Sequence, residues 1–140
     1  MVITYREKII NLWAVFLLGT LFHTQLGLMP LFHSLNVVES QPAKSLDEVS
    51  LIFWLMLGFF MLPMLAIIGT TFTENKRYRI LHFGLSVFYG FMNLMHLVLD
   101  LLLPRVIWYQ IALMAFLFLL GLLLIFVAYR WMKYPVNRQN

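Results

Sequence analysis

Residues 106–129 read VIWYQIALMAFLFLLGLLLIFVAY and contain no charged side chain. About 20 apolar residues are enough to cross roughly 30 Å of hydrocarbon as an α-helix, at about 1.5 Å per residue. Three further apolar stretches of similar length lie at 9–32, 49–72 and 80–103. None of them alternates apolar and polar residues with the period of two that a membrane β-strand needs. The sequence therefore predicts four transmembrane helices.

The composition of the whole chain is that of a membrane protein. Of its 140 residues, 62% are hydrophobic and 11% are charged, and the mean hydropathy is +0.85. Soluble domains have roughly 45–50% apolar and 25% charged residues. A chain of this length has room for one bundle. We therefore predict a single domain over residues 1–140 in a lipid bilayer, either a prokaryotic inner membrane or an internal membrane such as the thylakoid.

The distribution of basic residues predicts the orientation. The N-terminal segment, the link 73–79 and the C-terminal tail hold Arg6, Lys8, Lys76, Arg77, Arg79, Arg130, Lys133 and Arg138, whereas the other two connections hold only Lys44 and Arg105. An excess of Lys and Arg marks the cytoplasmic side. We expect an all-α membrane protein, an antiparallel up-down bundle with the N- and C-termini in the cytoplasm. Because the basic residues are divided among helix ends, no nucleic-acid partner is expected.

The third predicted helix carries a polar stripe. Between residues 82 and 100, polar side chains recur at steps of four and three, at His82, Ser86, Tyr89, Asn93, His96 and Asp100. At about 100° per residue, these six side chains fall within an arc of roughly 80°. A polar group that faces lipid is costly. We therefore expect the stripe to face the bundle interior or another protein.

The first predicted helix offers a matching surface, on which Thr20, His23 and Gly27 share one side. Counted from the cytoplasmic boundary, His23 lies about 21 Å along its helix and His96 about 24 Å along the third helix. The two imidazoles are therefore nearly level. We expect the first and third helices to meet there, with Thr20 and Asn93 completing a polar cluster in the outer half of the membrane.

Two level histidines suggest axial ligation of a tetrapyrrole, such as haem b, with one imidazole on each side of the flat ring. In this interpretation the site consists of the ligands His23 and His96, the polar neighbours Thr20 and Asn93, and Gly27 and Gly90, which leave space for the ring. The 14-residue separation of His82 and His96 resembles the histidine pairs of di-haem cytochromes b. A matching second pair is missing, because His23 and His33 are only 10 residues apart. One haem therefore fits better than two.

A metal or proton site is the second interpretation. His96 and Asp100 stand four residues apart on one face, and either His23 or His33 could add a second nitrogen, which gives an N2O set that zinc or copper accepts. The same ladder of polar groups could conduct protons, although Asp100 is its only carboxylate. A purely structural interpretation is that these groups bond neighbouring helices, at roughly 0.6 kcal/mol each. For His82 and His33, near the two boundaries, we expect interfacial positions.

Two local signals concern the second predicted helix. Ser45, followed three residues later by Glu48, has the form of a capping box at a helix start. Pro63 lies within the helix and lacks the backbone N–H that would bond the preceding turn. We expect a kink there and a carbonyl freed from the helical ladder.

No sequence feature indicates catalysis. The chain has no cysteine, and the sequence contains no HExxH, P-loop or nucleophile-elbow pattern. We expect a non-catalytic subunit or an accessory or assembly factor of a larger membrane complex, with other membrane-protein subunits or further copies of itself as partners. A tetrapyrrole-binding protein and a metal- or proton-handling protein are the alternatives.

Overall fold

The computed structural model describes residues 3–35, 45–103 and 106–135, and these residues are helical apart from short connections. The elements are α1 (Tyr5–Leu28), the short 3-10 helix η1 (Met29–His33), α2 (Leu46–Phe72), α3 (Lys76–Leu102) and α4 (Trp108–Lys133). Within the described ranges, four helical segments are long and apolar enough to cross a membrane. The prediction of an all-α chain with four helices of transmembrane length and hydropathy is confirmed.

The helix ends differ from the predicted boundaries where local capping decides them. The α1 helix begins before the apolar stretch because Thr4 and Glu7 form a capping box, in which each side chain accepts from the other's backbone N–H. Its α-helical part stops just before Pro30, where η1 takes over. At the start of α2, Ser45 is the N-cap residue, but its side chain makes no capping hydrogen bond. The capping box predicted there is wrong.

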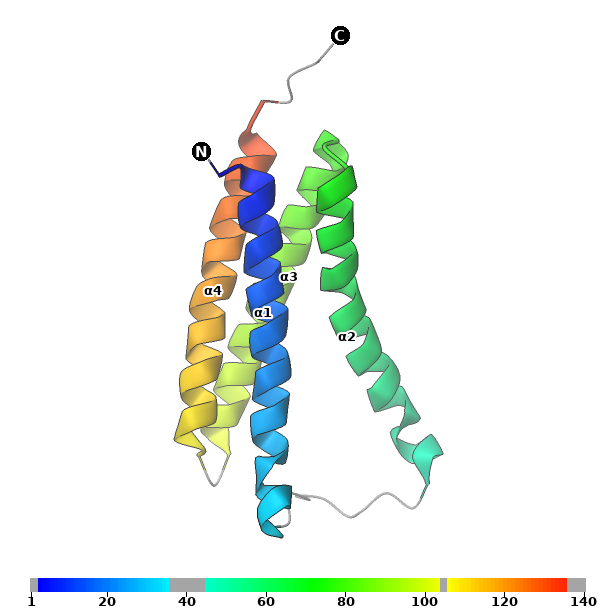
Figure 1. Cartoon of the computed structure of the whole chain (residues 1–140), viewed down its shortest axis with the longest axis vertical. Helices are drawn as coiled ribbons and strands as arrows, with labels where there is room; N and C mark the ends of the chain where they lie inside the picture. Colours follow the sequence, from blue (N-terminus) through cyan, green and yellow to red (C-terminus); the bar gives the residue numbers. More distant parts are fainter. Residues whose placement is uncertain (1–2, 36–44, 104–105, 136–140) are drawn as a thin grey trace.

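Close packing joins α4 to both α1 and α3, and α1 also packs against α2 (Figure 1). The buried apolar core is made by Ile9, Trp13 and Phe16 of α1, Ala66 of α2, Tyr89 of α3, and Met114, Leu117, Leu124, Val127, Ala128 and Trp131 of α4. Gly90 allows α3 and α4 to approach, since a Cβ atom on it would lie 2.7 Å from the Ile125 side chain of α4. This contact sets the position of the polar stripe against α4.

We call the end of the molecule where α1 begins and α4 ends the basic end, and the opposite end the far end (Figure 1). At the basic end, Arg6 of α1 donates hydrogen bonds to the backbone carbonyls of Thr70 and Thr71. It also forms an ion pair with Glu74 at 2.6 Å. The last carbonyls of a helix have no partner within the helix. Arg6 therefore caps the C-terminus of α2 and ties it to α1.

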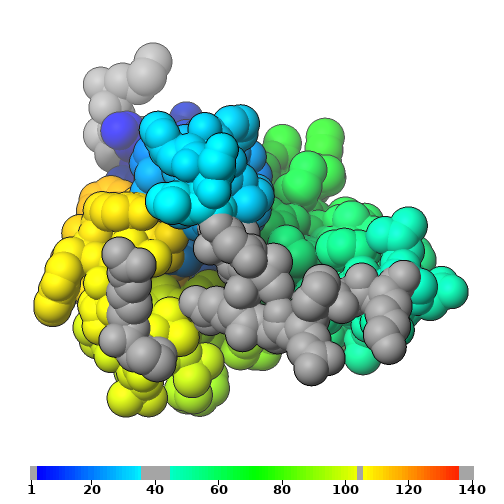
Figure 2. All heavy atoms as spheres, turned by 90° about the horizontal axis from the view of Figure 1, so that it is seen from below, coloured from blue at the N-terminus to red at the C-terminus, as the bar shows by residue number. Residues whose placement is uncertain are grey.

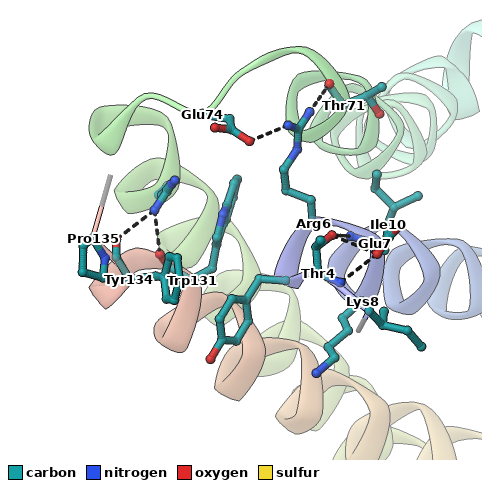
Figure 3. Close-up of a pocket in the computed structure, with 13 residues that line it drawn as sticks. Thr4, Arg6, Glu7, Lys8, Ile10, Thr71, Glu74, Trp131, Tyr134 and Pro135 are labelled. Atoms are coloured by element: carbon teal, nitrogen blue, oxygen red, sulfur yellow. Dashed lines mark hydrogen bonds and ion pairs between the residues drawn. The ribbon is translucent and has the colours of Figure 1, made fainter. Parts of the chain in front are cut away.

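Arg79 of α3 does the same for α4. Its guanidinium donates to the carbonyl oxygens of Trp131 at 3.2 Å and Tyr134 at 2.9 Å. A cavity of about 1160 Å³ opens between the four helix ends (Figure 3). Arg6 and Arg79 both line it. The basic end is thus held by side chains that cross between helices.

At the far end, α2 diverges from the other helices (Figures 1 and 2). The buried residues of α2 are Pro63, Ala66 and Thr70, all in the half nearer the basic end. In the other half, every residue from 51 to 57 is exposed. A stretch of seven residues covers nearly two helical turns, so no face of α2 is packed there. The predicted bundle therefore forms around α1, α3 and α4, and α2 joins it along only part of its length.

Candidate functional site

The polar stripe of α3 faces the other helices over most of its length. His82, Ser86, Tyr89 and Asn93 are buried, which agrees with the expected inward orientation. Arg79 is buried as well. From the sequence alone, Arg79 is expected only to help orient the chain in the membrane. The signal was present, since Arg79 continues the spacing of the stripe by one step of three. Toward the far end, His96 is exposed and Asp100 is partly covered.

In the basic half of the stripe, His82 lies in a satisfied hydrogen-bond network. The Trp13 indole N–H donates to His82 Nε2 at 3.1 Å, which leaves Nδ1 to carry the proton. That nitrogen lies 3.5 Å from Thr70 Oγ1, and the Thr70 hydroxyl donates to the carbonyl of Ala66 at 2.7 Å. His82 is only 1% exposed, so its side chain packs inside the protein. This histidine bonds α1, α2 and α3 together.

The Tyr89 hydroxyl satisfies a backbone carbonyl that Pro63 leaves without a donor. Pro63 cannot donate to the carbonyl four residues earlier, which belongs to Phe59. The Tyr89 hydroxyl donates to that carbonyl at 2.6 Å. The ring of Tyr89 also packs edge to face on Trp13, with centroids 5.3 Å apart. The freed carbonyl predicted from Pro63 is thus present, and its partner comes from the stripe of α3.

In the far half, the structure brings His23 and His96 together. Their ring centroids are 5.2 Å apart and their planes are nearly perpendicular, at 88°. Asp100 lies between them, with one oxygen 3.8 Å from His23 Nε2 and the other 3.5 Å from His96 Nε2. One donor atom from each of the three residues can be chosen so that all lie within 4.8 Å of one another. The expected meeting of α1 and α3 at these imidazoles is therefore observed.

These distances are close to those of a metal site. With metal–ligand bonds of about 2.0–2.1 Å, the ligand atoms of a tetrahedral zinc site stand about 3.4 Å apart. The two His–Asp separations, 3.8 and 3.5 Å, run to different oxygens of Asp100. Donor atoms taken one per residue lie within 4.8 Å of one another, so the three side chains must draw closer together to reach the zinc spacing. Three protein ligands leave one position of a tetrahedron open.

Several buried polar atoms at this site lack hydrogen bonds. His23 Nδ1, Asn93 Oδ1 and Asp100 Oδ2 have no hydrogen-bond partner among the described residues. Buried polar atoms in proteins are nearly always paired, so unpaired atoms call for an explanation such as a bound ion or water. The contrast with His82, whose two nitrogens both have partners, is clear. Arg79 Nε in the basic half is also unpaired. Of the unpaired atoms near the two imidazoles, the Asp100 oxygen is the one that an ion beside both Nε2 atoms would bond.

The other residues of the predicted tetrapyrrole site lie elsewhere. The Thr20 hydroxyl donates to the carbonyl of Phe16 in its own helix at 2.8 Å. A Cβ on Gly27 would approach the Gln110 side chain of α4, and a Cβ on Gly90 would lie 2.7 Å from Ile125 of α4. Gly90 therefore relieves packing against α4, whereas a Cβ at Gly27 would make an ordinary van der Waals contact; both glycines face α4.

The mutual orientation of the imidazoles also bears on the choice of ligand. Axial ligands of a tetrapyrrole approach the metal from opposite sides of a flat ring. Here the two imidazoles contact each other edge to face, and both direct Nε2 toward one carboxylate. The arrangement suits one small ion shared by three side chains better than a macrocycle held between two.

The chemistry of these residues is the basis for assigning a function. A comparison of the chain with family models, curated proteins and solved structures finds no match.

Proposed function

We propose that this protein is a multi-pass membrane protein that binds one divalent transition-metal ion between α1 and α3, with His23, His96 and Asp100 as ligands. The observation that supports it is the convergence of three donor atoms from two helices within 4.8 Å. Imidazole nitrogen and carboxylate oxygen are ligands that zinc and copper accept. We take Zn²⁺ as the reference ion.

The membrane setting supports the same conclusion. A carboxylate inside a transmembrane helix is costly unless it is paired, and such residues usually mark ion or substrate sites. Asp100 is largely covered, at 17% side-chain exposure, and its described neighbours are two histidines. A bound cation would neutralise the carboxylate and also use the free nitrogen lone pairs. The metal therefore explains why these three groups lie together.

The proposal includes an orientation. The basic end carries the Lys and Arg residues of the chain termini and of the link between α2 and α3, which favours a cytoplasmic location for that end. The metal site then lies in the outer half of the membrane. A metal-holding role in this place is compatible with a non-catalytic subunit of a larger membrane assembly, as the absence of catalytic motifs predicts.

Metal titration of the purified chain tests the proposal. The protein, extracted in mild detergent and stripped with a chelator, should bind one Zn²⁺ per chain by isothermal titration calorimetry. His23→Ala, His96→Ala and Asp100→Asn should each weaken binding by about 100-fold or more, since even loss of an outer-shell partner costs about 10–100-fold. His33→Ala is the matched control, because His33 is exposed in η1 and belongs to no described ligand cluster.

Three results would overturn the proposal. One is Zn²⁺ binding that survives all three ligand substitutions, and a second is the absence of Zn²⁺ binding. The third is a reducible Soret band in the untreated protein that disappears in both His23→Ala and His96→Ala. That spectrum would establish the tetrapyrrole alternative instead.

A further inference from the structure

One face of α3 changes its surroundings between Tyr89 and His96. The two residues are seven positions apart, so they lie within about 20° of each other on the helix. Tyr89 is 1% exposed because α1 and α2 cover it, whereas the side chain of His96 is 55% exposed. The same face therefore loses its cover where α2 diverges (Figure 1).

The uncovered part of α2 has few contacts that hold it in place. Residues 51–57 are exposed on all sides, and a Cβ on Gly58 would meet no atom within 4 Å. Pro63 follows and interrupts the helical hydrogen bonding. From Phe59 onward, by contrast, the hydrogen bonds of Tyr89 to Phe59 and of Arg6 to Thr70 fix the helix. The unpacked part of α2 therefore meets the fixed part at Gly58.

The packed face of α2 continues into the unpacked half. Taking Phe59 as zero at about 100° per residue, Ala66 lies at about −20° and Thr70 at about 20°. By the same count Ile52 lies at about 20° and Glu48 at about −20°. No proline lies between Glu48 and Phe59 to break this register. The first turn of α2 therefore carries a carboxylate on the face that packs against α1 and α3 further along.

Glu48 is also at the right depth. The contact of the Tyr89 hydroxyl with the Phe59 carbonyl, at 2.6 Å, sets the level of α2 against α3. Glu48 lies eleven residues before Phe59 and Asp100 eleven residues after Tyr89. The two helices run in opposite directions, so each step leads about 16 Å toward the far end. Glu48 and Asp100 are therefore level, each on the face that points at the other helix.

We infer that the outer half of α2 closes against α1 and α3 and brings the Glu48 carboxylate to the metal as its fourth ligand. This inference rests on the proposed function. Tetrahedral coordination by four protein ligands is the usual form of a closed zinc site. Closure would also cover the exposed His96 ring.

Charge balance favours the same arrangement. A divalent ion with two neutral imidazoles and the Asp100 carboxylate has a net charge of +1. A second carboxylate from Glu48 brings the net charge of the site to zero. Because an uncompensated charge within a membrane is costly, the ion itself would draw α2 inward.

Spin-label distances and zinc affinity test the closure together. The chain has no cysteine, so labels on Leu51→Cys of α2 and Leu99→Cys of α3 report one distance. In lipid nanodiscs, addition of Zn²⁺ should shorten that distance in the otherwise unchanged chain. Glu48→Gln should abolish the shortening and weaken Zn²⁺ binding by about 10-fold or more. The control is Asp47→Asn, which removes a neighbouring carboxylate about 100° away around the helix and should leave both measurements unchanged.

The outcomes separate this inference from the proposed function. If Zn²⁺ binds through His23, His96 and Asp100 while Glu48→Gln changes neither affinity nor distance, the metal site stands and the closure is wrong. Lipid or another subunit lodged beside α2 would give that result. A short distance before Zn²⁺ is added, unaffected by Glu48→Gln, would also refute a metal-driven closure. If the unchanged chain binds no Zn²⁺, the proposed function itself fails.

Discussion

Two halves of one polar stripe behave differently in this protein. In the basic half, His82 has a partner for each ring nitrogen and is contacted by side chains of α1, α2 and α4. In the far half, His96 lies on the same face of α3, yet its side chain is 55% exposed and its nearby groups include unpaired polar atoms. The same residue type on the same face is thus structural in one place and available in the other.

The difference shows that a polar residue in a membrane helix acquires its role from its partners. Where Trp13 and Thr70 complete the bonding of His82, the imidazole specifies how the helices pack. Where α2 does not cover the stripe, His23, His96 and Asp100 lie close together with donor atoms that an ion can use. A buried polar group that is fully bonded has little left to offer a ligand. The predictions below test this contrast.

The largest expected effect is on stability, in the basic half. His82→Ala should lower the free energy of unfolding by about 3–5 kcal/mol, because it leaves a cavity and a buried Trp13 N–H without an acceptor. His96→Ala, at an exposed position, should cost less than about 0.5 kcal/mol. Unfolding of both variants in detergent, followed by circular dichroism, measures the difference. Equal losses would show that the two halves do not differ in packing.

The same pair of variants should give the opposite order in metal binding. His96→Ala should weaken Zn²⁺ binding by about 100-fold, or about 2.7 kcal/mol, because it removes a ligand. His82→Ala should leave the affinity unchanged as long as the protein folds, because both nitrogens of His82 are used by other groups. Competition with a chromophoric chelator provides the affinities. Loss of binding in His82→Ala with an intact circular dichroism spectrum would contradict the division of roles.

A smaller effect concerns the hydrogen bond at the bend of α2. Tyr89→Phe leaves the Phe59 carbonyl without a donor and should cost about 1–2 kcal/mol. In a Pro63→Ala background the new backbone N–H can bond that carbonyl, so Tyr89→Phe should cost clearly less. The double-mutant cycle, measured by thermal unfolding, isolates the coupling. Identical costs in the two backgrounds would mean that Tyr89 contributes only through its ring.

The smallest effect is expected at Thr20. Its hydroxyl bonds the carbonyl of Phe16 within α1 and contacts no residue of another helix through a described hydrogen bond. Thr20→Val should therefore change stability by less than about 0.5 kcal/mol and leave Zn²⁺ affinity unchanged. Calorimetric titration of this variant is the check. A marked loss of Zn²⁺ affinity would place Thr20 in the site, as the tetrapyrrole interpretation does.

Much of the candidate site was predictable because it depends on helix geometry alone. The spacing of the stripe gave its inward face, and a constant rise per residue placed His23 and His96 at one level. The carbonyl freed by Pro63 followed from the missing N–H of proline. What could not be predicted was which side chains would complete the bonding. Trp13, Thr70 and Arg79 reach their partners from positions 52 to 69 residues away in the chain or through the turn between α2 and α3.

The sequence by itself determined the four apolar helices, the polar face of α3 and the pairing of two level imidazoles, because these follow from hydropathy and from the fixed period of an α-helix. Only the tertiary structure decided that His82 is buried among partners, that the glycines face α4 and that α2 separates toward the far end. Those features depend on the rotation and tilt of each helix, which are set by contacts among side chains from all four helices.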